Sequence, residues 1–168
     1  TLQEKIIGQF QLIENEISKK NKTKNKYFIK RVWKKNNKKE GGGTSYILSG
    51  GEVFDKVGIN QSTVSGQFEK IFRSKILGAK KNGKYWASGI SVVAHMKNPK
   101  IPAFHFNIRF IVTSKAWFGG GMDATPSCAD KKEKKFIHQK LKSVCNLNNK
   151  NYNKYKQWCD KYFYLPHR

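Results

Sequence analysis

Three polar side chains recur at every second residue of an otherwise apolar segment, and residues of these types could do chemistry. His105, Asn107 and Arg109 occur in residues 103–113 and alternate with Phe104, Phe106, Ile108, Phe110 and Val112. Successive side chains of a β-strand point to opposite faces, so the pattern predicts a strand with one core face and one polar face. Polar groups are costly to bury unpaired, so the second face is either an internal hydrogen-bonded network or an anion-binding, proton-transferring site. Arginine suits a carboxylate there.

A second strand is predicted just before the first. In residues 88–95 the same parity puts Ser91 and His95 on one face. The connection, residues 96–102, contains Pro99 and Pro102, which exclude regular pairing within it. If the two strands are neighbours, Ser91, His95 and the three polar residues of the later strand form one surface.

The four histidines, His95, His105, His138 and His167, are the residues most suited to proton transfer or metal binding near neutral pH. Their spacing contains neither HxxxH nor HExxH, so each histidine taken singly is better explained as a structural or surface residue, with His105 the exception because of its strand neighbours. Asp55, Asp123 or Asp160 could pair with a histidine, and the sequence does not choose between them. The glycine-rich segments match neither GxGxxG nor a P-loop, so nucleotide binding is not supported.

Hydrophobic periodicity and turn residues predict the elements that must position these groups. Residues 2–19 have helical spacing, and a linker rich in lysine and asparagine leads to a strand at 27–33. Gly41–Gly43 interrupts the chain before a hairpin of residues 44–48 and 53–59, and residues 67–85 are ambiguous. Residues 117–123 are aromatic anchors followed by glycines. Two helices are expected to close the chain, one at about 130–145 and one over residues 152–163. Pro166 should stop the second helix before His167.

The net charge of +23 points to a solvated surface or to an acidic partner. Only four of the 34 Lys and Arg residues are arginines, and many lysines lie beside asparagines. Dispersed lysine chiefly solvates a surface, so we interpret the charge mainly as compositional bias. The alternative is binding of a nucleic acid or a polycarboxylate.

The 168 residues are enough for one domain, and the cysteines indicate a reducing compartment. Cys128, Cys145 and Cys159 have no CxxC spacing, so we expect buried, unpaired thiols. There is neither a signal segment nor a run of 18 apolar residues. These features predict a single domain, residues 1–168, in the cytoplasm and without a membrane span.

Several longer strings together resemble the oxygen-dependent coproporphyrinogen III oxidases. They arrive in that family's order and approximate spacing, and they are residues 40–43, 50–59, 89–95 with 98–99, 102 with 105–110, 117–126, and 155–163 with 167–168. The resemblance implies an α+β fold, with a large antiparallel β-sheet flanked by α-helices. It implies oxidative decarboxylation of two propionates of coproporphyrinogen III to vinyl groups, which gives protoporphyrinogen IX in haem biosynthesis. Dioxygen is the co-substrate, there is no organic cofactor, and the full-length proteins form homodimers.

The resemblance also implies roles for individual residues. Ser91, Asn107, Ile108 and Arg109 match positions that contact substrate, and His105 matches the proposed proton donor. His95, His105, His138 and His167 match histidines that some bacterial members use for a divalent metal such as manganese. Whether a metal is required stays open.

The sequence departs from the family in two ways. It corresponds to an N-terminal portion of about half the family length, so we expect the C-terminal part, which helps to hold substrate and form the dimer, to be missing. Phe136 stands where a further histidine is often found. The rival hypothesis is therefore an inactive remnant or fragment that acts, if at all, as a basic nucleic-acid-binding protein.

Overall fold

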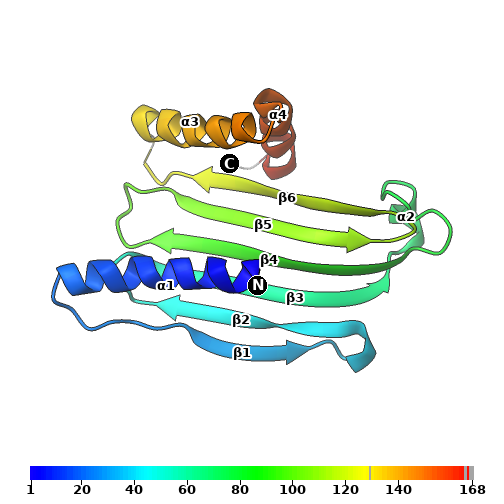
Figure 1. Ribbon diagram of the computed structural model, residues 1–168, viewed down its shortest axis with the longest axis horizontal. Helices are drawn as coiled ribbons and strands as arrows, with labels where there is room; N and C mark the ends of the chain where they lie inside the picture. Colours follow the sequence, from blue (N-terminus) through cyan, green and yellow to red (C-terminus); the bar gives the residue numbers. More distant parts are fainter. Residues whose placement is uncertain (129, 165, 167–168) are drawn as a thin grey trace.

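The protein is built on one antiparallel sheet. The computed structural model describes residues 1–128, 130–164 and 166. The six strands follow one another in the order of the sequence, each antiparallel to the next (Figure 1). They are β1 (Ile29–Lys34), β2 (Gly41–Ser49), β3 (Phe54–Gln67), β4 (Lys84–Met96), β5 (Ala103–Val112) and β6 (Ala116–Thr125). The helices are α1 (Leu2–Lys20), the short α2 (Lys70–Arg73), α3 (Lys131–Leu147) and α4 (Tyr152–Phe163), with a 3-10 turn at Lys38–Glu40. The predicted α+β class, an antiparallel sheet flanked by helices, is confirmed.

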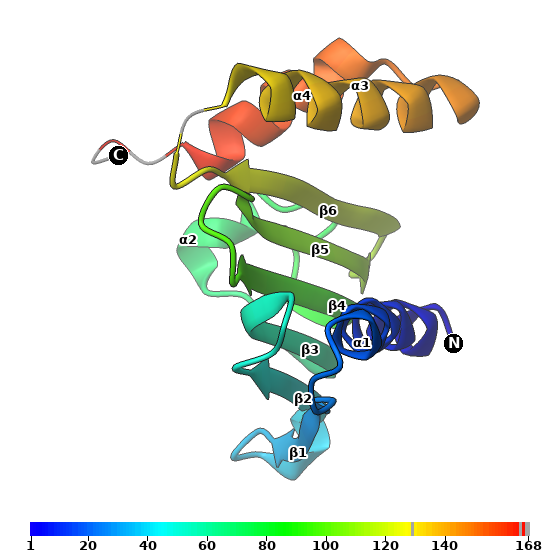
Figure 2. The ribbon, with the colours of Figure 1, turned by 90° about the vertical axis from the view of Figure 1, so that its left-hand side faces the viewer.

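Helix α1 covers the apolar face of the middle strands. Its start is a capping box, in which the Thr1 hydroxyl accepts from the Glu4 amide and the Glu4 side chain accepts from Thr1 in return. Ile6, Ile7 and Phe10 pack against the core. That core consists of Leu48, Phe54, Val57, Ile59, Ile90, Val92 and Ala94. Figure 2 shows α1 on one side of the sheet, which leaves the other face for different partners.

A buried carboxylate joins α1 to the turn between β2 and β3. Glu14 is fully buried, and its side chain accepts hydrogen bonds from the backbone amides of Glu52, Val53 and Phe54. Ser18, one turn later, also donates to it. A side chain at Gly51 would meet the carboxylate, with a Cβ only 2.6 Å from its oxygens. The sequence analysis did not identify this contact, since a glutamate in an amphipathic helix is normally solvated.

Glu14→Ala is expected to lower the free energy of unfolding by about 3 kcal/mol or more. The substitution leaves three backbone amides without their acceptor, and each buried donor without a partner costs about 1–3 kcal/mol. The measurement is urea denaturation followed by circular dichroism. Glu16→Ala removes the same charge from an exposed position of the same helix and should change stability by less than about 0.5 kcal/mol. Equal losses in the two variants would contradict a specific role for Glu14.

The structure corrects several predictions at glycine-rich segments. Gly41–Gly43 lies inside β2 rather than interrupting the chain, and β3 runs on to Gln67 rather than ending at 59. Residues 117–123 belong to β6, which the sequence analysis did not predict. Gly42 shows why glycine occurs in a strand here, because a Cβ there would lie 2.3 Å from the carbonyl oxygen of Trp33. Such close backbone approach is invisible to hydrophobic periodicity.

Two further predictions concern the cysteines and membrane insertion. All three cysteines are unpaired, but they are not buried: Cys128 is exposed, and Cys145 and Cys159 are half-buried. The expectation of buried thiols was therefore wrong, because α3 and α4 stand outside the main core. Within the described residues, every helix is too short or too polar to cross a bilayer.

Candidate active site on the polar face of the sheet

The predicted surface of polar side chains exists on the sheet face opposite α1. Ser91 of β4 pairs with Asn107 of β5, and Val93 pairs with His105, so β4 and β5 are neighbours as expected. Paired residues share a face, which places the predicted polar residues of both strands together. The register extends their row across the whole sheet, through Arg31, Ser45, Asn60, Ser91, Asn107 and Gly121. The sequence could not give this alignment, because register depends on strand pairing.

Hydrogen bonds on the polar face join the predicted site residues in two pairs. The Arg109 guanidinium donates to Asn107 Oδ1 over 2.9 Å, and Asn107 is only 5% exposed. The Ser91 hydroxyl lies 3.4 Å from His105 Nε2. Arg109 is exposed, so its remaining donors face solvent or a ligand. The face carries a cation and a titratable imidazole four residues apart on β5, roughly 13 Å along the strand, which are the groups that anion binding and proton transfer need.

Residues from α4 and β6 complete the surroundings of His105. The Phe163 ring meets the imidazole edge-on, with centroids 5.5 Å apart and planes at 89°. Asp123 of β6 is paired with His105 in the β5–β6 register and shares its face. Thr125 donates to Asp123 Oδ2 over 2.8 Å. Of the three aspartates that the sequence left open, Asp123 is thus the cross-strand neighbour of His105, and Asp160 lies near enough to His138 for its charge to raise the pKa of that imidazole.

Ile108 does not share the polar face. It pairs with Ile90 and Gly120, and its side chain packs against the core cluster under α1. Only its backbone could therefore contribute to a ligand on the polar face.

The described histidines do not converge on one point. His95 is exposed near the end of β4, on the same face as His105. His138 lies on α3, where its Nδ1 is 2.7 Å from the Tyr152 hydroxyl of α4. Partial burial lowers the pKa of His138, as do the charges of Lys156 and Lys134, while Asp160 raises it. His167 is outside the described residues.

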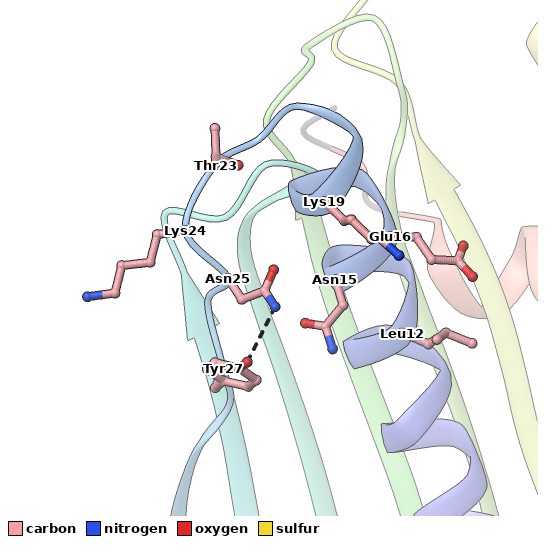
Figure 3. A pocket seen from close by; sticks show the side chains of 8 residues that line it. All are labelled: Leu12, Asn15, Glu16, Lys19, Thr23, Lys24, Asn25 and Tyr27. Carbon is pink, nitrogen blue, oxygen red and sulfur yellow. Dashed lines mark hydrogen bonds between the residues drawn. The ribbon is translucent and has the colours of Figure 1, made fainter.

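No group of three or more ligating side chains within residues 1–128, 130–164 and 166 could hold a metal ion. The described residues therefore do not fit a metal centre. A hollow of about 670 Å³ lies elsewhere, between the second half of α1 and residues 23–27 (Figure 3). None of the predicted site residues lines it.

These features define an α+β protein whose sheet separates an apolar, helix-covered face from a polar face that carries His105, Asn107 and Arg109. The whole chain, residues 1–168, matches the family model described as Coproporphyrinogen III oxidase, and the chain belongs to that family.

Curated relatives agree with the family assignment. Oxygen-dependent coproporphyrinogen-III oxidases of Rickettsia bellii (strain OSU 85-389) and Rickettsia akari (strain Hartford) are 45% and 46% identical to it over 168 residues. A Rickettsia rickettsii (strain Sheila Smith) relative of the same name is 45% identical. Each alignment covers 99% of this chain and 59% of the relative. The chain thus spans less than two thirds of its relatives' length. None of these matches supports the nucleic-acid alternative.

Proposed function

We propose that this chain forms the sheet and much of the active site of an oxygen-dependent coproporphyrinogen III oxidase. The reaction would convert two propionates of coproporphyrinogen III to vinyl groups, without an organic cofactor. Each propionate would lose one molecule of carbon dioxide, and one dioxygen would take up the two electrons and two protons to leave as hydrogen peroxide. The observation that supports this best is the joint presence of Ser91, His105, Asn107 and Arg109 on one polar sheet face. The oxygen dependence is taken from the Rickettsia relatives, which are named oxygen-dependent coproporphyrinogen-III oxidases.

Each residue has a role that its surroundings support. Arg109, held by Asn107, would bind a substrate carboxylate through a charge-assisted hydrogen bond. His105, beside Ser91 and opposite Asp123, would donate a proton as the propionate reacts. Ser91 would contact substrate, and Ile108 would contribute through its backbone.

The macrocycle itself supplies much of the reactivity. Its electron-rich pyrroles can react with dioxygen, so the protein has chiefly to orient the substrate, exclude water and manage protons. A basic chain also lowers the cost of burying a tetracarboxylate. The cytoplasmic location, the homodimer and the divalent metal on His95, His105, His138 and His167 stay predictions.

Arg109→Ala is expected to weaken binding of coproporphyrin III, the stable oxidised form of the substrate, by roughly ten- to a hundredfold. A hydrogen bond to a charged group contributes about 1.5–3 kcal/mol, which gives this range. Porphyrin fluorescence titration measures the affinity. Lys100→Ala removes one positive charge from the exposed β4–β5 turn and serves as the matched control. Unchanged affinity in a folded Arg109→Ala protein would contradict this role.

A further inference from the structure

A second arginine lies on the same sheet face as the proposed site. Arg31 of β1 pairs with Ser45, and the register continues through Asn60 and Ser91 to Asn107. Arg31 therefore occupies the same transverse row as Ser91 and Asn107, on the polar side of the sheet. Nothing in the strand pattern of the sequence alone relates residues 31 and 107.

The two arginines of this face, Arg31 and Arg109, are on opposite sides of the middle strands, over which the proposed function places the substrate. Arg31 is on β1 and Arg109 on β5, with three strands between them (Figure 1). Neighbouring strands are about 4.8 Å apart, so four spacings separate these strands by roughly 19 Å. Between them the row consists of small or short polar side chains, Ser45, Asn60 and Ser91, which leave room for a flat ligand above the sheet.

The side chain of Arg31 is free to bind an anion. It is exposed, and none of the ion pairs found within residues 1–128, 130–164 and 166 includes it. Beside it, the Ser45 hydroxyl donates to Asn60 Oδ1 over 2.6 Å, which leaves the amide N–H groups of Asn60 to donate to a ligand. Guanidinium groups bind carboxylates with two parallel hydrogen bonds, which the more numerous lysines cannot do.

We infer that Arg31 binds a second peripheral carboxylate of the tetrapyrrole, at the opposite rim from the carboxylate bound by Arg109. This inference rests on the proposed function, because it assumes a flat ligand with carboxylates around its edge. Arg31 then acts as a specificity-determining residue. Two cations on opposite sides favour a macrocycle with carboxylates on opposite sides over one with carboxylates on one side only.

The test compares two porphyrins and three variants of the 168-residue chain. Coproporphyrin III carries four carboxylates and protoporphyrin IX carries two, on adjacent rings. Fluorescence titration should show that Arg31→Ala weakens coproporphyrin binding by about tenfold and protoporphyrin binding clearly less. Arg31→Lys, which keeps the charge without the fork, should lie in between. Lys30→Ala removes the same charge from the neighbouring position, which points to the other face, and should change either affinity less than about twofold.

The outcomes separate this inference from the proposed function. If the unaltered chain binds coproporphyrin and Arg31→Ala behaves like Lys30→Ala, the role of Arg31 is refuted and the proposed function stands. Equal weakening for both porphyrins would also overturn it, since a general charge effect would then suffice. If the unaltered chain binds neither porphyrin even when it is mixed with the C-terminal part of a full-length relative, the proposed function fails and the inference fails with it. Circular dichroism of each variant verifies that the fold is retained.

Discussion

Produced alone, residues 1–168 are expected to convert coproporphyrinogen III at least about 10²-fold more slowly than the same chain mixed with the C-terminal part of a full-length relative. Rates of this kind fall by about that factor when a substrate is misplaced by even 1 Å. The chain spans 59% of the Rickettsia bellii relative, so the remainder of that protein is the natural second component. Vinyl-group formation, followed by porphyrin fluorescence after oxidation, measures the rate.

The isolated chain exposes a strand edge and apolar side chains, and this exposure is the physical reason to expect that it needs the second component. Strand β6 ends the sheet and has no further strand partner in the part of the chain that the structure describes. Phe118 on β6 is 74% exposed, and it continues an aromatic cluster with Phe110 and Trp86 beyond the reach of α1. On α4, Trp158 and Tyr162 are 65% and 72% exposed. An open strand edge and an apolar patch favour aggregation, so the isolated chain should also be marginally soluble.

Two controls make this prediction specific. The C-terminal part alone should show no turnover, because His105 and Arg109 are on this chain. An unrelated basic protein mixed with that part should show none either. Robust turnover by residues 1–168 alone would instead show that the polar face between Ser91 and Asp123 is a complete site.

His105→Gln is expected to slow vinyl-group formation in the reassembled protein by about 10²–10⁴-fold, the usual contribution of a positioned general acid or base. Glutamine keeps a polar side chain near Ser91 but cannot supply a proton at neutral pH. Coproporphyrin affinity should change much less than the rate, because the carboxylate contact of Arg109 does not depend on His105. This contrast between rate and affinity distinguishes loss of proton transfer from loss of binding.

His95→Gln is the matched variant for this prediction. His95 lies on the same sheet face but is exposed and displaced along β4, without the Ser91 and Phe163 contacts of His105. Its substitution should slow the reaction by no more than about tenfold. A large loss at His95 with a small loss at His105 would reverse the assignment of the proton donor.

Local patterns in the sequence were sufficient for much of the framework of this site. The periodicity of residues 2–19 predicted α1, which ends one residue later at Lys20. Alternation in residues 88–95 and 103–113 predicted β4, β5 and the sharing of one face by Ser91, His105, Asn107 and Arg109. These features depend on the order of apolar and polar residues within one segment, which the sequence states directly.

Other features depend on partners far away in the chain, and only the tertiary structure decided them. Strand β6 escaped prediction because Gly120 packs against the backbone of β5 and Gly121 against Phe163 of α4, contacts that no local pattern encodes. Glu14 became buried because the amides of a turn almost forty residues later bind its carboxylate. Asp123 and Phe163 reach His105, and Arg31 joins the row of Asn107, through strand register and helix packing. Register and packing arise from the burial of whole faces at once, and the sequence of a single segment cannot determine them.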